Sequence, residues 1–543
     1  MPTNAEAADQ LREIADLLDV TGERFKPEAY RRAARSVESL TEPLAVVAGR
    51  GGLREIPGVG EAIAEKLTEF LATGRIPYLD RLHAEIPSGL LALMRLPGLG
   101  PKTARRFWLE LGIEGPAELG DAIAAGRLVG VAGFGPKKIE QIRGALAAAP
   151  TARTGHRFPI EEVYPIARSI VDALVAGAPT ERVELAGSFR RCRETVGDLD
   201  VLVTSDAAER VFDVFSALPE VHEIRMRGPT KETVVMRNGL QVDLRVVEPA
   251  AFGAALQYFT GSKDHNVRLR TIARDAGLKI NEYGVFRGEE RVAGATEADV
   301  YERMGVPWIP PELREDGHEI DAARAGTLPD PVAARDLVGD LHLHLPPLAD
   351  GATIARIGAD AHRRGIADLG VVVDGPPDAD GPAAAPDELR RFLRDDRSTR
   401  WHLAAEATPD TVRSPVADVE YLILRPGRAP AAPSVVPDRP VPVRLVAHVG
   451  PDPIAARPWI DLARSIDAAI EVGPGPERLD STGARAALAV GGTLSVPTGV
   501  GLPERDPLGP VALGFARRAG ATAARVTNAR PWPNGRPAAR PHR

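Results

Sequence analysis

The stretch Glu184–Val203, ELAGSFRRCRETVGDLDVLV, decides the fold of this chain. Its first residues predict a strand and Gly187-Ser188 a tight turn, and the segment from Asp198 to Val203 predicts a second strand. A period of two places Asp198 and Asp200 on the same face of that strand. Two carboxylates on one edge repel each other unless a cation lies between them, which favours a cation site over a solvated acidic face.

A third carboxylate, Asp243, lies in another strand-like segment, residues 240–247. Three convergent carboxylates are suitable ligands for two Mg²⁺ ions that clamp an attacking hydroxyl and a leaving pyrophosphate. In the turn, Gly187 and Ser188 let backbone amides approach phosphate oxygens, and Arg190 and Arg191 add positive charge.

A Gly-Ser turn followed by a paired-Asp strand resembles the nucleotidyltransferase superfamily, and Gly187–Arg191 with Gly197–Asp200 is similar to the palm of the X-family DNA polymerases. The resemblance implies a template-directed DNA polymerase that fills short gaps in base excision repair or end joining. It implies two Mg²⁺ or Mn²⁺ ions, bound by Asp198, Asp200 and Asp243. The implied partners are gapped or nicked duplex DNA, dNTPs and a ligase or end-joining proteins, with no membrane.

Composition agrees with a protein of about three to four domains. Of 543 residues, 44% are hydrophobic and 26% charged, as in soluble globular proteins. The chain has no apolar run of roughly 20 residues and no signal peptide, and its single cysteine indicates a reducing, cytoplasmic location. A DNA polymerase in that location would be nucleoid-associated. The net charge is −7, and acidic and basic residues nearly balance in residues 1–150, so DNA binding would depend on local patches and backbone amides.

A short unit recurs three times, in Ile56–Ala64, Leu96–Ala104 and Val131–Ile139. Each copy has an apolar residue, a Gly-x-Gly hairpin and a helix start. Free amides at a helix start suit a phosphate group, with Na⁺ or K⁺ alongside. These units resemble helix-hairpin-helix motifs, which hold duplex DNA without reading its sequence. The expected DNA-binding residues here are Gly58, Gly60, Gly98, Gly100, Lys102, Gly133, Gly135 and Lys137.

The segments Phe25–Ala34 and Pro57–Lys66 are similar to the small amino-terminal domain of polymerase β. The resemblance implies that Lys66 forms a Schiff base with the sugar at an abasic site, a deoxyribose-phosphate lyase reaction. This chemistry needs an unprotonated amine, obtained by burial or by cationic neighbours. Ala62 stands where the animal enzymes have a second lysine, so a phosphate-contacting surface lysine is the alternative.

A second motif, Tyr258–Asn266, reads YFTGSKDHN and precedes a predicted helix. An aromatic pair before a glycine turn can wall a sugar pocket that disfavours a 2′-hydroxyl, although core packing is the plainer role. The motif resembles the Tyr-Phe-Thr-Gly-Ser element of the X family. That resemblance implies minor-groove contact by Asn266 and template contact by Arg270. The nucleotide-binding residues implied are Arg157, Gly187, Ser188, Arg191, Tyr258, Phe259, Gly261 and Asn266.

Two positions depart from the pattern of the family. Gln241 replaces the arginine before the third aspartate, and Cys192 replaces a small glycine, which affects proton handling and turn geometry. Gly228–Lys231 is predicted to be a hairpin loop whose lysine could touch DNA.

The segment Asp340–His344, DLHLH, places two imidazoles on one side of a strand, as at many metal sites. It resembles the first motif of the PHP domain, a metal-dependent phosphoesterase barrel. The expected metal positions are His342, His344, Asp350, Glu406 and His448. Other ligands of the pattern are missing near Asp374 and in Leu494–Gly499, so we expect the 3′-5′ exonuclease to be lost and the domain to persist as a scaffold.

The expected fold is multidomain: α-helical helix-hairpin-helix amino-terminal domains, an α+β nucleotidyltransferase palm and a degenerate carboxy-terminal α/β PHP-type barrel. The expected boundaries are 1–80 (lyase-like), 81–152 (helix-hairpin-helix), 153–249 (palm), 250–322 (nucleotide selection), 323–336 (linker), 337–527 (PHP) and 528–543 (disordered tail). The alternatives are a nucleotidyltransferase for RNA or small molecules, a non-catalytic DNA-binding repair scaffold, and a PHP nuclease with residual metal binding.

Overall fold

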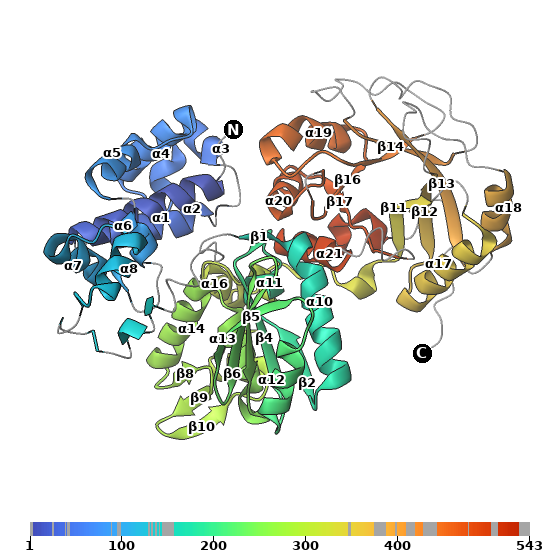
Figure 1. Cartoon of the computed structure of the whole chain (residues 1–543). Helices are drawn as coiled ribbons and strands as arrows, with labels where there is room; N and C mark the ends of the chain where they lie inside the picture. Colours follow the sequence, from blue (N-terminus) through green and yellow to red (C-terminus); the bar gives the residue numbers. More distant parts are fainter. Residues whose placement is uncertain are drawn as a thin grey trace. The chain divides into compact units, whose positions relative to one another are not determined.

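The computed structural model (Figure 1) describes residues 4–23, 26–38, 40, 44–87, 89–94, 99–128, 131, 134–135, 138–140, 142–143, 157–345, 349–373, 387–396, 399–408, 419–426, 442–475, 477–500 and 509–530. They fall into two compact units, residues 1–156 and 157–543. No helix among them is long and apolar enough to cross a bilayer.

The first unit is helical, as predicted, and its described residues share one apolar core. Its helices are α1 (Asn4–Thr21), α2 (Lys26–Glu38), α3 (Leu44–Gly49), α4 (Glu61–Thr73), α5 (Pro77–Glu85), α6 (Gly89–Met94), α7 (Pro101–Leu111) and α8 (Pro116–Ala124). Apolar residues at helical spacing in α1, including Leu11, Ile14 and Leu18, are buried in this core.

The first two Gly-x-Gly motifs end at the N-caps of helices. Gly60 precedes α4 as its N-cap, and Gly100 has the same place before α7, where Pro101 fills the first helical position. Gly58 has φ +85°, and a Cβ there would lie 2.7 Å from Arg32 Cγ, so the turn requires glycine. Gly98, Gly133 and Lys137 lie outside the described residues.

The second unit begins with the palm, a five-stranded sheet in the order β2-β4-β7-β6-β5 (Figure 1). Its strands are β2 (Arg182–Leu185), β4 (Asp198–Thr204), β5 (Val221–Arg227), β6 (Lys231–Met236) and β7 (Gln241–Val246). A small antiparallel pair, β1 (Phe158–Pro159) and β3 (Thr195–Val196), flanks the sheet. Both strands predicted from Glu184–Val203 are therefore present, but Gly187–Arg190 form a one-turn helix, α11, between them.

The two faces of β4 divide the palm. Leu199 and Val201 pack into the core that includes helices α10 (Ile160–Gly177) and α12 (Ala208–Ser216). Leu202 packs with Phe252 and Ala255 of helix α13 (Phe252–Thr260). Because side chains alternate along a strand, Asp198 and Asp200 lie on the α13 side, as the spacing predicts.

Residues after α13 form a smaller subdomain with its own core. It contains the sheet β10-β9-β8, built from β8 (Lys279–Asn281), β9 (Gly284–Arg287) and β10 (Glu290–Ala293), with helices α14 (Lys263–Asp275), α15 (Glu297–Arg303) and α16 (His318–Arg324). A 3-10 turn, η3 (Pro311–Leu313), precedes α16. The linker expected at residues 323–336 thus begins within α16.

The carboxy-terminal part is an open half-barrel of seven parallel strands, each paired with the next along the chain. The strands are β11 (Gly339–Leu345), β12 (Asp368–Val373), β13 (Arg400–Ala407), β14 (Tyr421–Leu424), β15 (Val443–Val446), β16 (Ala469–Glu471) and β17 (Thr493–Ser495). Its helices are α17 (Gly351–Arg364), α18 (Asp387–Asp395), α19 (Pro453–Ser465), α20 (Ser481–Ala489) and α21 (Gly509–Arg518). This architecture agrees with the predicted PHP-type α/β barrel.

The expected disordered tail requires a correction at its start. Asn528, in the short 3-10 turn Thr527–Ala529, is 2% exposed. Its side-chain amide donates to the carbonyls of Gly339 and Val496, over 2.9 and 2.7 Å, and its Oδ1 accepts from the Val496 amide. The ordered barrel therefore extends through Asn528, because this side chain joins β11 to the segment after β17. Residues 531–543 lie outside the described residues.

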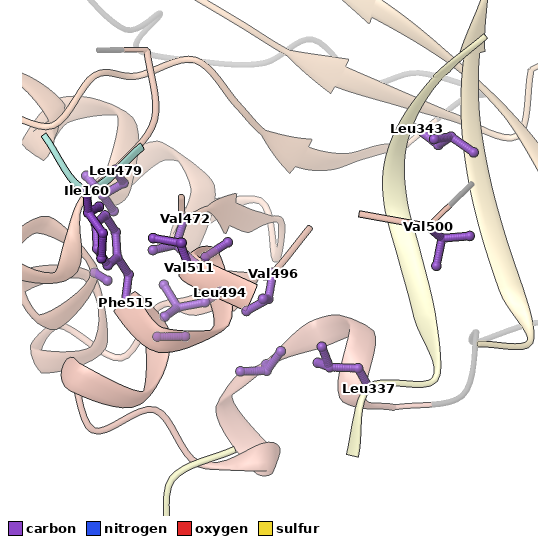
Figure 2. Packing of buried hydrophobic residues seen from close by; sticks show 14 of the residues in the cluster. Ile160, Leu337, Leu343, Val472, Leu479, Leu494, Val496, Val500, Val511 and Phe515 are labelled. Atoms are coloured by element: carbon purple, nitrogen blue, oxygen red, sulfur yellow. The ribbon is translucent and has the colours of Figure 1, made fainter. Parts of the chain in front are cut away.

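The palm and the half-barrel share one apolar core. Figure 2 shows Ile160, from the start of palm helix α10, among the side chains of Leu479 and Phe515 from the barrel. Next to this core, Cys192 has φ +50° and lies against Gly514 of α21. A Cβ at Gly514 would lie 2.2 Å from Cys192 Sγ, so the cysteine in the palm turn fits only because α21 has glycine opposite it.

We predict that Gly514→Ala destabilises the second unit by about 1–3 kcal/mol, because the new methyl group overlaps Cys192. Cys192→Gly removes the overlap and suits the positive φ, so the same alanine costs less in that background. Urea unfolding of the four proteins measures the difference. Gly120→Ala, in α8 with open space around it, is the control for a helical glycine. Equal costs of Gly514→Ala in both backgrounds would contradict the contact.

Candidate active site

The predicted carboxylate triad is assembled on two neighbouring strands. β4 and β7 pair in parallel, and Asp200 is directly opposite Asp243 in the register. Asp198 is exposed, Asp200 half-buried and Asp243 buried. The structure thus places all three predicted metal-binding residues at one end of the palm sheet.

Gly187 packs against the carboxylate of Asp200. It has φ +64°, and a Cβ there would lie 2.7 Å from Asp200 Oδ2. Only glycine combines this backbone conformation with such a close approach to a carboxylate. Ser188 follows it in α11, so the Gly-Ser pair lies directly beside Asp200.

The carboxylates carry the electrostatic strain expected of a cation site. Burial, with the charges of Asp198 and Asp243, raises the pKa of Asp200 to about 7. Burial and Asp243 also raise the pKa of Asp198. A donor set of three carboxylates suits a hard divalent cation, which would remove this repulsion. The residues therefore fit the predicted Mg²⁺ or Mn²⁺ ligands.

Two further palm side chains hold Asp243. Lys231 Nζ lies 2.6 Å from Asp243 Oδ2, and the Thr233 hydroxyl donates to Oδ1 over 2.8 Å. Lys231 begins β6 rather than lying in the loop where it was expected. Gln241, the departure noted in the sequence, has its amide nitrogen 3.4 Å from Asp243 Oδ1. The roles of Lys231 and Thr233 were missed because only the pairing of β6 with β7 brings them to the site.

The arginines of the turn are tied to the subdomain after α13. Arg190 donates two 2.8 Å hydrogen bonds to Glu297 and another to the Thr260 hydroxyl. Arg191 donates to the Thr260 carbonyl over 2.5 Å and to Glu315 over 3.2 Å. Arg190 therefore links the palm to the subdomain after α13. Arg191 lies beside Gly261, where a Cβ would be 3.1 Å from Arg191 Nη1.

The Tyr258–Asn266 motif spans the end of α13 and the start of α14. Tyr258 and Phe259 are half-buried and meet edge to face, with centroids 5.1 Å apart. Asn266 donates to the Tyr258 carbonyl over 2.7 Å and accepts a hydrogen bond from the Gln257 amide. Arg270 is exposed one turn further along α14, with Nε 3.3 Å from the Asn266 carbonyl.

Arg157 lies at the start of the palm, where it was expected. It donates to the Thr195 hydroxyl and carbonyl, over 2.8 and 2.5 Å. Its charge lowers the pKa of Asp198, against the larger effect of burial. This arginine is thus electrostatically coupled to the carboxylate group.

In the first unit, Gly58, Gly60, Gly100 and Gly135 are exposed, as is Lys102. Lys66 lies on α4, and its amine donates to the Ala62 carbonyl over 3.0 Å. The same amine is 4.9 Å from the centre of the Tyr78 ring. Lys66 is therefore accessible beside an aromatic ring rather than deeply buried.

The half-barrel brings four of the five predicted metal positions together. One donor atom from each of His342, His344, Glu406 and His448 lies within 4.8 Å of the others. Asp350 is apart from this group: its carboxylate caps α17 by accepting from the Thr353 amide over 2.8 Å. Three imidazoles and a carboxylate match the donors of a site for one transition metal ion.

Glu471 is a further carboxylate at this site that the sequence did not reveal. Its Oε1 lies 3.1 Å from His342 Nδ1, while Glu406 Oε1 lies 3.1 Å from Nε2 of the same ring. Burial alone would lower the pKa of His342, but Glu471 and Glu406 outweigh it and raise the pKa to about 10. The sequence of strand β16, Ala-Ile-Glu, has only one acidic residue in an apolar segment, which does not by itself predict a metal site.

Beside His342, two hydrogen bonds join the first strand of the half-barrel to the segment that follows its last strand. The Thr498 amide and hydroxyl donate to Asp340 Oδ2 over 2.7 and 2.6 Å. Thr498 belongs to the segment where a closing Asp-x-His was expected and is missing. Asp374, the other expected departure, lies outside the described residues.

Four family models match successive parts of the chain. Residues 157–240 match the DNA polymerase beta palm and residues 255–315 the DNA polymerase beta thumb. Residues 2–76 match a helix-hairpin-helix domain, and residues 90–148 a SAM-like helix-hairpin-helix tandem. A palm and thumb that follow helix-hairpin-helix domains are the domain order that the X-family resemblance implies.

Three known DNA polymerases are similar to this chain in sequence. The chain is 35% identical over 359 residues to the DNA polymerase/3′-5′ exonuclease PolX of Bacillus subtilis (strain 168). It is 27% and 22% identical to the proteins named DNA polymerase lambda from Rattus norvegicus and Arabidopsis thaliana. These alignments cover 65, 58 and 57% of this chain, and 61, 56 and 62% of the relatives. The chain is therefore similar to the bacterial X-family DNA polymerases over about three fifths of the length of these relatives.

We predict that Asp200→Asn stabilises the metal-free protein at pH 8 but not at pH 4–5. The folded-state pKa of Asp200, about 7, exceeds the unfolded value. The protonated carboxyl is therefore favoured in the folded state, and its stabilising contribution is lost as pH rises through about 7. Melting curves of both proteins in EDTA should diverge by a few degrees above pH 7, and Mg²⁺ should selectively raise the wild-type melting temperature.

Asp206→Asn is the control, because Asp206 is exposed just after β4. Parallel pH profiles for wild type and Asp200→Asn would show that the carboxylates do not repel one another as the structure indicates.

Proposed function

We propose that the protein is a DNA-directed DNA polymerase that extends a primer across a short gap. One observation supports this proposal above all: Asp200 and Asp243 are register partners on parallel strands β4 and β7, and Gly187 packs against Asp200. This arrangement supports a site for two divalent cations held by Asp198, Asp200 and Asp243. When bound, the cations would neutralise the triphosphate and lower the pKa of the attacking hydroxyl.

The chain's own residues would orient the reactants. Asp243, held by Lys231 and Thr233, would accept the proton of the primer 3′-hydroxyl. Ser188, Arg191 and Arg157 would bind the triphosphate. Ser188 and Arg191 follow Gly187, which lies against Asp200, and Arg157 interacts with Asp198. Most of the rate would come from positioning and charge stabilisation.

Selection of the nucleotide would fall to the end of α13. Tyr258 and Phe259 would wall the sugar, with Gly261 allowing the close turn. Asn266 would contact the nascent pair in the minor groove and Arg270 the template. The hydrogen bonds that fix the Asn266 amide support this assignment, because a preorganised amide loses little freedom on binding.

The first unit would hold the duplex on either side of the gap. Exposed glycines before α4 and α7 support backbone-amide contacts with phosphates, with Na⁺ or K⁺ alongside. A gap-filling polymerase would serve base excision repair or end joining, where a ligase or end-joining proteins would act on the product. Lys66 beside Tyr78 supports a lyase step at the 5′ side, with phosphate contact as the alternative.

For the half-barrel, we propose that it still binds one divalent metal ion but no longer has 3′-5′ exonuclease activity. The donors of His342, His344, Glu406 and His448 support the metal ion. The segment that would complete a larger cluster instead bonds Asp340 through Thr498. A nuclease that works with fewer metals is the second candidate, favoured by the same four donors and by the exonuclease in the Bacillus subtilis relative's name.

The test is extension of a labelled primer on a gapped duplex with a 5′-phosphate, with Mg²⁺ or Mn²⁺ and four dNTPs. We expect wild type to fill the gap and Asp243→Ala to lose at least about a hundredfold in rate, because the triad loses a ligand. Asp206→Asn should match wild type. A wild type that leaves the primer unextended would reject the polymerase in favour of a non-catalytic DNA-binding scaffold, and a preference for ribonucleotides would favour another nucleotidyltransferase.

The same reactions without dNTPs test the half-barrel. We expect no shortened primer with either metal. Shortening that disappears in Glu406→Gln would establish a surviving nuclease and overturn the loss.

A further inference from the structure

Helix α21 of the half-barrel ends in two arginines that reach the polymerase part of the chain. Arg517 forms a two-pronged pair with Glu312, at 2.6 and 3.3 Å. Arg518 is 7% exposed and donates to Glu315 Oε1 over 2.5 Å, while its Nε lies 3.6 Å from Glu194. A buried arginine thus lies between one carboxylate of the palm and one that follows η3.

Glu315 is the centre of this group. Besides Arg518, it accepts hydrogen bonds from Arg191 Nε at 3.2 Å and from Arg193 Nη1 at 3.0 Å. Burial would raise the pKa of Glu315, but the three arginines outweigh burial and lower it. Glu315 is therefore ionised and shared among three guanidinium groups, one of which belongs to the nucleotide-binding turn.

Arg518 contributes one positive charge to a buried group in which Arg191 and Arg193 face Glu194 and Glu315. Loss of Arg518 makes this group more negative by one charge and leaves Glu315 shared between Arg191 and Arg193 alone. Because charges in a buried group are weakly screened, that loss would reach the triphosphate site.

Further packing and hydrogen bonds support the contact between α21 and the palm. Gly514, one turn before Arg518 on α21, leaves the space that Cys192 fills, and Cys192 lies between Arg191 and Arg193 in sequence. The Ser481 hydroxyl, at the start of α20, also donates to Glu194. Two helices of the half-barrel therefore hold the segment from Arg191 to Glu194.

We propose that Arg518 is a positioning residue for the polymerase reaction: it shares the charge of Glu315 so that Arg191 remains aimed and available for the triphosphate of the incoming nucleotide. The half-barrel is then part of the nucleotide-binding apparatus, whatever the state of its own metal site. This inference rests on the proposed polymerase function, since it assigns Arg191 to a triphosphate.

The test compares Arg518→Gln, Arg518→Lys and Arg517→Gln in the full chain. Arg517 is the matched control, because it is adjacent and forms an ion pair across the same contact but does not touch Glu315. Single-nucleotide insertion into a gapped duplex gives KM and kcat for the dNTP. We expect Arg518→Gln to raise KM about tenfold with kcat changed less than about threefold, because it weakens binding of the triphosphate.

Arg517→Gln should leave KM within about twofold of wild type while lowering the melting temperature as Arg518→Gln does. Arg518→Lys should recover most of the loss, because it keeps the charge. Equal KM increases for Arg517→Gln and Arg518→Gln would reduce Arg518 to a docking residue and overturn the proposal, as would an unchanged KM in Arg518→Gln.

A double variant separates charge from packing. Glu194→Gln with Arg518→Gln returns the buried group to the net charge that it has in wild type, so we expect the KM of the double variant to fall back toward wild type. A double variant as weak as Arg518→Gln would overturn the electrostatic account.

Titration with mant-dATP and Mg²⁺ distinguishes this inference from the proposed function. If wild type extends no primer, the polymerase proposal fails, and nucleotide binding still tests Arg518. Weaker mant-dATP binding by Arg518→Gln than by Arg517→Gln supports the inference, whereas equal dissociation constants overturn it.

Discussion

Asp198, Asp200 and Asp243 place three carboxylates on one face of two strands that pair in parallel, and the rest of the polymerase part depends on how their charges are balanced. The strand period and the register fix their proximity, and burial makes it costly, as the raised pKa of Asp200 shows. Lys231 offsets the charge of Asp243, and Gly187 leaves room for Asp200 where a Cβ would collide with its carboxylate. A site with this much unbalanced negative charge is prepared for cations.

The arginines near these carboxylates are held by residues from distant parts of the chain. Arg190 is held by Glu297, and Arg191 by Thr260 and Glu315, so the turn and the thumb form one hydrogen-bonded body. Glu315 in turn is shared with Arg518 of the half-barrel. The half-barrel therefore contributes to the polymerase part whatever the state of its own metal site, because its helices hold the segment from Arg191 to Glu194.

Local patterns predicted much of this arrangement. The alternation after Asp198, the Gly-Ser pair and the His-x-His segment each specify side-chain direction within a few residues, and the structure brings Asp198 with Asp200, and His342 with His344, together accordingly. Lys231, Glu315, Glu471 and Arg518 carry no local signal, because their partners are 12 to 203 residues away. Asp350 and Asn528 were misjudged for the same reason: a helix cap and a buried amide depend on neighbours that a linear pattern does not contain.

Electron paramagnetic resonance of bound Mn²⁺ tests the central claim most directly. The protein would carry His344→Ala and Glu406→Gln to remove the half-barrel donors, and would be bound to gapped DNA and a non-hydrolysable dNTP. The account predicts two Mn²⁺ ions close enough for their spins to couple, and loss of the coupled pair in Asp243→Asn. A single uncoupled ion, or a pair that survives Asp243→Asn, would contradict it.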